Sequence, residues 1–477
     1  MRVPTAAAAA LALLIALVLA DSAGAVTCTH PASAYSTGAP LGATPGGPVN
    51  DPAFSEQWGL TKIKAPAAWA RGAKGGGAVI AVVDTGVDLH HPDLSANLVG
   101  GKDVTPSADQ SCAGPQDENG HGTHVSGIAA ASTNNGIGVA GTAPTAKVMP
   151  VRVLDAEGSG DDPTVIKGMK YAADHGAKVI NLSLGGEPII GEAPQFNAEI
   201  AKAAAYAYSK GALVVAAAGN ESLPLCSYPA AAAKAVCVGA VDRTGAPAAY
   251  SNFPTSTNGA IGVRAPGGTT GFDCEDPLDI WSTIWPGAAD DCTGSGLLSG
   301  YETLAGTSMA TPFVSGLAAI LSGKGLSNGQ ILNCLKQTSS NHGSFDPVMG
   351  YGVIDADAAT RQCSKSKTPS RVTGGGLKLS VTRQRISRKR LARKRKLRVS
   401  VKANRKVTVR LRAVARARKG AKARTIARKR VTLRKAGKRS ATMKLSRKAA
   451  RFLRKHRRAT FKVRWSGAGR RGTARAR

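Results

Sequence analysis

The chain has 477 residues, of which 43% are apolar, 4% aromatic and 20% charged, so it can bury a full hydrophobic core and is too long for one ordinary domain. Of its 64 Lys and Arg residues, 45 lie in residues 364–477, which contain no acid, whereas residues 1–363 hold 19 basic and 30 acidic side chains. The net charge of +34 therefore describes neither part, which argues against a single basic nucleic-acid-binding protein and predicts an acidic module joined to a very basic one.

The N-terminus has the pattern of a secretory signal peptide. Arg2 precedes an uninterrupted apolar run over residues 6–20, and a small-residue Ala-Gly-Ala site ends at Ala25. The run has 15 residues, whereas a membrane span needs about 20, so a cleaved signal over residues 1–25 fits better than a membrane anchor. We therefore expect an exported, extracellular protein. Residues 26–50 are rich in Ala, Gly, Pro, Ser and Thr and are predicted to be a leader without a fold of its own.

The next part of the chain alternates short apolar runs with helix-length segments. Strands are predicted at residues 78–83, 148–154, 179–184, 213–218 and 235–241, and helices after His121 and at residues 163–175, 198–209, 308–322 and 328–337. Near-continuous Val, Ala and Ile strands separated by helices indicate a parallel sheet that is covered on both faces. The predicted fold class is α/β, with a doubly wound, mostly parallel sheet forming one domain over residues 51–363.

A linker and a second domain are predicted to follow. Residues 364–376 carry Ser, Lys, Pro and three consecutive glycines, a composition typical of linkers. Beyond them, residues 397–402, 406–411 and 460–465 alternate apolar with basic side chains. A period of two on branched and aromatic residues predicts strands with one buried face, so residues 377–477 are expected to form a small basic β-sandwich.

The cysteines of a chain that is predicted to be exported suggest disulfide bonds. There are eight of them, an even number, and no CxxC pair occurs that would favour a zinc site. The sequence alone does not assign their connectivity. Local spacing favours three pairs, which are Cys226 with Cys237, Cys274 with Cys292 and Cys334 with Cys363, and this leaves Cys28 for Cys112 by elimination.

Three segments place a reactive side chain at the end of a predicted strand or the start of a predicted helix. Asp84 lies in VVDTGVD, His121 in NGHGTHVSG and Ser308 in GTSMATP. An acid, a histidine and a serine are the groups that acyl transfer to a serine oxygen requires, and free N–H groups at the start of a helix suit a developing oxyanion. Taken singly, each residue has an ordinary alternative role, as a turn-capping Asp, a structural His or an N-cap Ser.

Together, and in the order Asp, His, Ser, these segments resemble the subtilisin-like serine proteases over about residues 50–360. The resemblance implies a serine endopeptidase with Asp84, His121 and Ser308 as its catalytic triad and with no cofactor in the chemistry. It also implies that Asn220, which ends the segment VVAAAGN, supplies an oxyanion-hole amide beside the backbone N–H of Ser308. The segment NLSLGG resembles the substrate strand of the family, and the substrate-binding residues are expected to be Ser183, Leu184, Gly185, Ala217 and Gly219.

The sequence offers two candidate cation sites. His124 lies three residues after His121, but no HExxH pattern is present and the resemblance implies that His124 packs near the triad. The segment that begins at Pro48 resembles the mature start of thermitase-like enzymes, which implies a structural calcium site made of hard oxygen donors. The implied ligands are Asp51, Asp93, Thr133, Asn135, Ile137 and Val139.

Two interpretations of the whole chain remain after the motifs are assigned. The first is a secreted endopeptidase acting on polypeptides, with an apolar or broad preference, because a preference for Lys or Arg would sever its own basic tail. Glu221 is either at the rim of the primary pocket or a solvated surface charge. The alternative is an inactive subtilase scaffold that acts as a polyanion-binding protein. In both, the basic C-terminal domain is expected to bind cell-wall polymers, an anionic surface or nucleic acid, although it has few aromatic residues for stacking bases. The alternative for this domain is a solvated polycation that only aids solubility.

Overall fold

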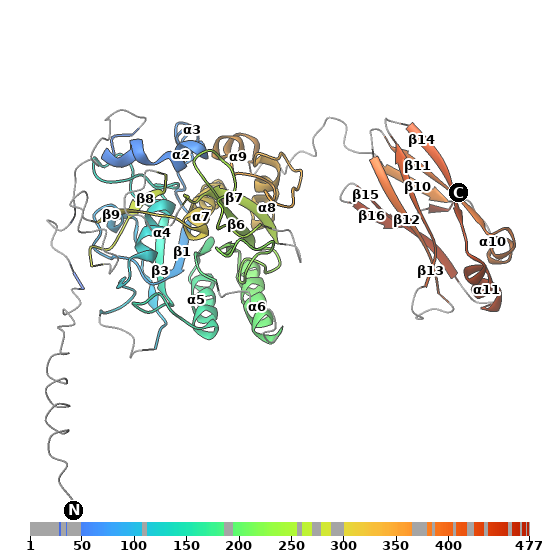
Figure 1. The fold of residues 1–477 in the computed structure, drawn as a ribbon, viewed down its shortest axis with the longest axis horizontal. Coiled ribbons are helices and arrows are strands. Elements are labelled where there is room, and N and C mark those ends of the chain that lie inside the picture. Colours follow the sequence, from blue (N-terminus) through green and yellow to red (C-terminus); the bar gives the residue numbers. More distant parts are fainter. Residues whose placement is uncertain are drawn as a thin grey trace, which may run out of the picture. The chain divides into compact units, whose positions relative to one another are not determined.

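The computed structural model describes residues 28–29, 35, 49–106, 112–185, 194–254, 260–269, 278–287, 300–364, 379–383, 387–403, 407–416, 424–433, 437–456, 460–467, 470–473 and 475–476. The chain divides into two compact units, Met1–Pro369 and Ser370–Arg477 (Figure 1), and each is described by itself. The predicted signal peptide and all of the predicted linker except residue 364 lie outside the described residues. In the described part of the chain, no helix is long and apolar enough to cross a membrane.

The first unit is built on a seven-stranded parallel sheet with the strand order β2-β3-β1-β4-β5-β6-β7. Its strands are β1 (Val79–Asp84), β2 (Lys102–Asp103), β3 (Lys147–Arg152), β4 (Val179–Leu182), β5 (Leu213–Ala217), β6 (Val236–Val241) and β7 (Ile261–Pro266). This confirms the predicted fold class, and the five predicted strands are present with ends shifted by at most two residues. The sequence analysis missed β2 and β7.

Helices cover both faces of this sheet, which explains the continuous apolar strands. On β1, Ile80 and Val82 point into one core cluster, whereas Ala81 and Val83 point into the other. The first cluster includes residues of the helices α4 (His121–Ala130) and α7 (Thr307–Gly323). The second includes residues of α5 (Asp162–Asp174) and α6 (Pro194–Lys210), which lie side by side in Figure 1. Burial on both sides removes the polar alternation that a half-exposed strand would have.

The remaining elements of the first unit lie around this layered core. They are the 3-10 helices η2 (Pro52–Glu56) and η3 (Ser95–Asn97), the α-helices α2 (Trp58–Lys62), α3 (Ala65–Trp69), α8 (Asn328–Thr338) and α9 (Ala356–Gln362), and the antiparallel strands β8 (Ile280–Thr283) and β9 (Tyr301–Leu304). Local sequence sets several helix starts. Asp161 accepts a hydrogen bond from Thr164 N at 2.8 Å and so caps α5, while Ser327 and Gln330 form a capping box on α8.

Three of the four predicted disulfides are present, and they join Cys28 to Cys112, Cys226 to Cys237 and Cys334 to Cys363. The predicted pair of Cys274 and Cys292 lies outside the described residues. The first disulfide ties the predicted leader to the first unit. Tyr35 of the same segment is buried, and its hydroxyl donates to Asp88 Oδ2 at 2.6 Å. These two residues of the segment therefore pack on the unit, although its composition suggested no fold.

The second unit contains two four-stranded sheets, β14-β11-β10-β17 and β13-β12-β15-β16 (Figure 1). Its elements are β10 (Leu379–Arg383), α10 (Arg388–Lys394), β11 (Lys396–Ala403), β12 (Val407–Arg416), β13 (Arg424–Leu433), β14 (Gly437–Lys444), α11 (Arg447–Lys455), β15 (Thr460–Gly467), β16 (Arg470–Thr473) and β17 (Arg475–Ala476). One hydrophobic cluster includes Leu397 and Val399 of β11 and Val409 and Leu411 of β12. The prediction of a β-rich C-terminal region is confirmed.

Candidate active site

The parallel sheet brings the predicted catalytic residues together at one edge. Asp84 is the last residue of β1, Ser183 directly follows β4, and Asn220 comes soon after β5. His121 and Ser308 lie in the first turns of α4 and α7. In an open parallel sheet the carboxyl ends of the strands meet the amino ends of the following helices at the same edge, where ligands bind. Residues far apart in the sequence therefore border a common space.

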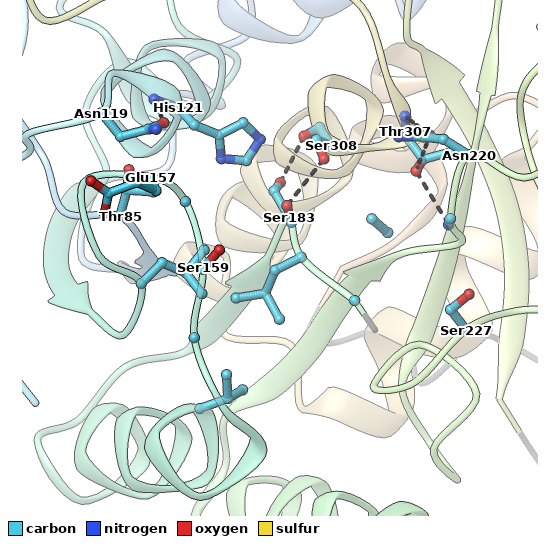
Figure 2. Close-up of a pocket in the computed structure, with 18 of the residues that line it drawn as sticks. Thr85, Asn119, His121, Glu157, Ser159, Ser183, Asn220, Ser227, Thr307 and Ser308 are labelled. Atoms are coloured by element: carbon cyan, nitrogen blue, oxygen red, sulfur yellow. Dashed lines mark hydrogen bonds between the residues drawn. The ribbon is translucent and has the colours of Figure 1, made fainter. Parts of the chain in front are cut away.

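Asp84 orients His121. The carboxylate of Asp84 is fully buried, and its Oδ1 lies 2.6 Å from His121 Nδ1 and 2.9 Å from Thr85 N. The hydrogen bond leaves the other ring nitrogen, Nε2, facing away from Asp84, and Figure 2 shows the ring directed toward Ser308. Burial by itself lowers the pKa of His121, but the charge of Asp84, its hydrogen bond and the more distant charge of Asp117 raise the pKa above its ordinary value.

Asp117 holds the start of α4 in place, and the sequence analysis did not single it out. Its Oδ1 accepts from Thr85 Oγ1 at 2.9 Å and its Oδ2 accepts from Thr123 Oγ1 at 2.6 Å. Gly122, next to His121, lets the backbone at the start of α4 approach the backbone at Gly86 closely. A Cβ on Gly122 would lie 2.1 Å from the carbonyl oxygen of Gly86, so only glycine permits the contact.

The nucleophile candidate, Ser308, is not hydrogen-bonded to His121 in this structure. Its hydroxyl donates to the carbonyl oxygen of Ser183 at 3.0 Å, and the hydroxyl of Ser183 donates to the carbonyl oxygen of Ser308 at 2.7 Å (Figure 2). Rotation about the Cα–Cβ bond of Ser308 would turn its oxygen toward the imidazole. Hydrogen bonds of this kind are often formed only when substrate is bound, so the geometry is compatible with a nucleophile and base.

Asn220 is aimed by a residue that the sequence analysis missed. Its Oδ1 accepts from Thr307 N at 2.9 Å and from Thr307 Oγ1 at 2.8 Å, as Figure 2 shows. Because the amide oxygen is held twice, the orientation of the amide group is determined and its Nδ2 is turned away from Thr307. Ser308 N belongs to the first turn of α7, where backbone N–H groups have no partner within the helix. Two N–H donors thus lie close to the Ser308 side chain.

These residues border a cleft of about 540 Å³. All five predicted substrate-binding residues line it, together with His121, Asn220 and Ser308. The sequence analysis missed a further wall, which comes from the segment between β3 and α5 and from the start of α5. It consists of Leu154, Glu157, Gly158, Ser159, Gly160, Asp161, Asp162 and Val165. The sequence did contain a feature that could have predicted this wall, namely a glycine-rich loop directly after a predicted parallel strand. Such a loop lies at the edge of the sheet where ligands bind.

The cleft has an acidic lining. Glu157, Asp161, Asp162 and Glu221 are among its lining residues, whereas no described Lys or Arg is. Glu221 is exposed, yet its Oε2 accepts from Asn252 Nδ2 at 2.5 Å and lies 2.5 Å from where a Cβ on Gly219 would be, so it is part of the pocket wall. Basic substrate side chains would be attracted here. The apolar or broad preference expected from the sequence stays a prediction.

Four residues of the predicted calcium site are joined by hydrogen bonds. Asp51 Oδ1 accepts from Asn135 N at 3.1 Å, and Asp93 Oδ1 accepts from Asn135 Nδ2 at 2.6 Å. Val139 N donates to Asp93 Oδ2 at 2.9 Å. Burial raises the pKa of Asp51, and burial together with the charge of Asp51 raises the pKa of Asp93 to about 7, against the effect of its hydrogen bonds. Two buried carboxylates beside the amide of the exposed Asn135 form a donor set that fits calcium.

His124 does not face the cleft. It is fully buried, and its Nε2 lies 3.1 Å from the carbonyl oxygen of Glu302. Burial lowers the pKa of His124 to about 3, so the ring is neutral. Across the described segments, no group of three or more His, Cys, Asp or Glu side chains is arranged to hold a metal ion. These contacts agree with the packing role that the sequence analysis expected.

Comparisons with known proteins agree with this geometry. The model of the subtilase family matches residues 75–352. Thermitase from Thermoactinomyces vulgaris is 41% identical over 313 residues, which cover 65% of this chain and 99% of thermitase. Subtilisin Savinase from Lederbergia lenta is 40% identical over 65% of this chain and 100% of its own length. A solved structure of a protease from Pseudoalteromonas arctica has a TM-score of 0.56 and 32% identity, covering 66% of this chain and 99% of that one.

Proposed function

Since this chain belongs to the subtilase family and is a serine-type endopeptidase, we propose that it is an exported enzyme whose catalytic triad is Asp84, His121 and Ser308. The observation that carries the proposal is the convergence of His121, Asn220 and Ser308 on one cleft, with buried Asp84 hydrogen-bonded to His121. An inactive scaffold, the alternative, gives no reason for all four groups to keep this arrangement. The apolar N-terminal run supports export.

The chemistry follows from these positions. Ser308 Oγ attacks the carbonyl carbon of the peptide bond while His121 Nε2 takes the hydroxyl proton, and Asp84 stabilises the imidazolium through the Nδ1–H hydrogen bond. The tetrahedral intermediate collapses when His121 returns that proton to the leaving amine, which breaks the C–N bond and leaves an acyl-enzyme. Water, deprotonated by His121, then attacks the ester, and Ser308 leaves with its proton restored. No cofactor takes part in these steps.

The two N–H donors beside Ser308 form the oxyanion hole of this proposal. Asn220 Nδ2 and the backbone N–H of Ser308 donate to the oxygen that becomes negative in the tetrahedral intermediate. The hydrogen bonds from Thr307 to Asn220 support this role, because they orient the amide before the charge develops. An amide that is already oriented requires no reorganisation at the moment of reaction.

The substrate is proposed to bind as an extended strand. Ser183, Leu184 and Gly185 continue the direction of β4 into the cleft, so their backbone groups can pair with a peptide in the manner of an added strand. Backbone pairing does not depend on the identity of the substrate side chains. The small residues Ala217 and Gly219 leave space in the primary pocket next to Glu221.

A structural calcium ion is proposed near η2. Asp51, Asp93 and Asn135 would hold it with side-chain oxygens, and Thr133, Ile137 and Val139 with backbone carbonyls. The ion would neutralise two buried carboxylates, neither of which forms an ion pair with a Lys or Arg residue within the described segments. It would also tie the start of the mature chain to the loop before β3.

Removing calcium is expected to lower the melting temperature. Calcium at about 100 times its dissociation constant adds ~2.7 kcal/mol of folding free energy if it binds only the folded state. A calcium chelator should therefore shift the melting temperature of the wild-type protein down by several degrees, and Asp51→Asn should reduce this shift. Differential scanning calorimetry with and without chelator measures both. Superimposable wild-type curves would contradict the calcium site.

The rate of peptide hydrolysis is expected to rise with pH through the pKa of His121. The base must be neutral to take the Ser308 proton, and its pKa is raised by Asp84, so protonation should suppress kcat/KM already at mildly acidic pH. Below this pKa, kcat/KM should fall about tenfold per pH unit. Rates of hydrolysis of casein or a peptide ester, measured from pH 4 to pH 10, test both the proposed protease function and the role of His121 as general base. Full activity at pH 4 would contradict His121 as base, and no hydrolysis at any pH would contradict the proposed function.

The C-terminal unit is proposed to retain the enzyme near a polyanion. It carries most of the 45 Lys and Arg residues of residues 364–477, which the small acidic excess of the rest of the chain does not neutralise. For an exported protein the available polyanions are cell-wall polymers, anionic surfaces and nucleic acid. Binding to any of them would weaken steeply as salt rises, because bound counterions are released.

A further inference from the structure

The outward face of one sheet in the C-terminal unit carries directly opposed arginines. In the sheet β13-β12-β15-β16, Arg412 stands opposite Arg428 on one neighbouring strand and opposite Arg464 on the other, and Arg410 stands opposite Arg430. The β12 residues that alternate with Arg410 and Arg412 belong to the hydrophobic core. The five arginines therefore occupy register positions on the solvent side of the sheet. We call them the arginine face.

This arrangement is unfavourable unless an anion is present. Arg412, Arg428 and Arg430 are exposed, and Nε of Arg412 donates to Thr425 Oγ1 on β13 at 2.6 Å, which holds its guanidinium over the sheet. Residues directly opposite on an antiparallel pair have Cβ atoms about 4.5–5.5 Å apart, and like charges there are destabilising. Residues 364–477 contain no Asp or Glu, so the unit has no carboxylate of its own to compensate.

The other sheet of the same unit lacks opposed arginines. On the outward side of β14-β11-β10-β17, Ser400 stands opposite Ser440 and Thr382, and the two serine hydroxyls are 3.1 Å apart. Lysines lie on either side of these three hydroxyl residues, and at one end Lys396 stands opposite Lys444. Both faces are thus basic, but within the described strands only one places arginines at adjacent register positions across three strands. The difference allows a matched comparison within one protein.

We propose that the arginine face binds a flexible, linear phosphate-diester polymer that lacks bases, an inference that rests on the proposed retention near a polyanion. Guanidinium groups bind phosphate bidentately, which lysine cannot do. The arginine positions are about 4.8 Å apart across strands and about 6.8 Å apart along β12. A polymer with one phosphate in each short repeat unit can therefore contact several of these arginines at once.

The aromatic residues of this sheet argue against recognition of bases. Phe461 and Trp465 of β15 stand opposite Ala415 and Leu411, which are buried, so both occupy register positions on the core side. Among the described residues, no aromatic residue occupies a register position on the arginine face, where a base would need a ring to stack on. A rigid duplex also presents its phosphates on a curved surface, and few of them would reach a row of arginines that crosses three strands.

Binding of the full-length protein to lipid-free poly(glycerol phosphate) tests this inference, with Ser308→Ala as background to prevent self-digestion. The variant Arg412→Gln/Arg428→Gln/Arg430→Gln removes three exposed charges from the arginine face. Its matched control, Lys396→Gln/Lys402→Gln/Lys444→Gln, removes three exposed charges from the other sheet. The arginine variant should bind roughly tenfold or more weakly, and the slope of log affinity against log salt should fall by about 2, since each lost phosphate contact removes ~0.7. The lysine variant should bind like the parent.

The outcomes separate this inference from the retention proposal. Equal weakening in both variants would mean that net charge alone attracts the polymer, which overturns the arginine face as its site. Tighter binding of the parent to duplex DNA than to poly(glycerol phosphate) at equal salt would overturn the choice of ligand. If the parent binds neither polymer at low salt, the retention proposal itself fails.

The arginine variant should keep or raise the melting temperature, because it relieves repulsion between opposed charges. A large decrease in the melting temperature of the arginine variant would contradict the premise that the opposed arginines repel each other and destabilise the sheet.

Discussion

Replacing Ser308 by alanine is expected to abolish peptide-bond hydrolysis while leaving the fold intact. The substitution removes only the oxygen that is proposed to attack the carbonyl carbon. The side chain makes one hydrogen bond, to the carbonyl oxygen of Ser183, and such a bond contributes about 0.5–1.5 kcal/mol. The expected loss in kcat is about 10⁶-fold, a size taken from subtilisin, whose nucleophile has been removed in this way. Some acceleration over water should remain from the oxyanion hole and substrate binding.

Casein digestion and a chromogenic peptide measure this effect, with circular dichroism melting as the check on folding. Ser95→Ala is a suitable control, because Ser95 is exposed and lies in η3, apart from the residues that line the cleft. The control should retain wild-type kcat. A Ser308→Ala protein that melts like the wild type and still digests casein at the wild-type rate would show that another group is the nucleophile.

Replacing Asn220 by alanine is expected to lower kcat by about 10²–10³-fold with little change in KM, a magnitude measured on the corresponding donor of subtilisin itself. In the proposed mechanism, the amide Nδ2 has its strongest interaction with the oxyanion, which exists only after Ser308 has attacked. Ground-state binding of the substrate depends mainly on other residues of the cleft. A loss confined to KM would place Asn220 in substrate binding rather than in the oxyanion hole.

Thr307→Val provides a sharper test of how Asn220 is positioned. It removes the hydroxyl that donates to Asn220 Oδ1 at 2.8 Å but keeps the backbone donor, so kcat should fall less than in Asn220→Ala. In the Asn220→Ala background the same change should have little further effect on kcat, because there is no amide left to orient. Thr307→Ser, which keeps the hydroxyl, should stay close to the wild type. Additive losses would mean that Thr307 acts independently of Asn220.

In the C-terminal unit, the alternation of apolar and basic residues predicts some strands but not β13. The strands β11, β12 and β15 were predicted because their apolar residues alternate strictly with basic ones. In β13 three consecutive basic residues interrupt that alternation, and Lys429 is exposed although it stands opposite buried Leu411. At the edge of a sheet a long basic side chain can reach water from an inward position. The pattern of β13 is thus explained only by its place beside β12.

The sequence by itself determined the fold class of the first unit, the locations of five of its strands and the three segments that bear Asp84, His121 and Ser308. These features are local: a strand buried on both faces must be apolar at every position, and a reactive group at a strand end needs glycines beside it for close backbone contacts. The spacing of the cysteines also indicated two of the disulfides found among the described residues, and elimination gave the third, Cys28 with Cys112.

Only the tertiary structure decided which distant groups meet. The contact of Asp84 with His121, the orientation of Asn220 by Thr307 and the acidic wall between β3 and α5 each join segments that sequence separates by tens of residues. The order of strands in the sheet determines these meetings, and side-chain hydrogen bonds then select the rotamers. The arginine face likewise depends on strand register, because a shift of one residue would turn every side chain to the other face. Neither strand order nor register is encoded in a local pattern, since both result from packing the whole unit.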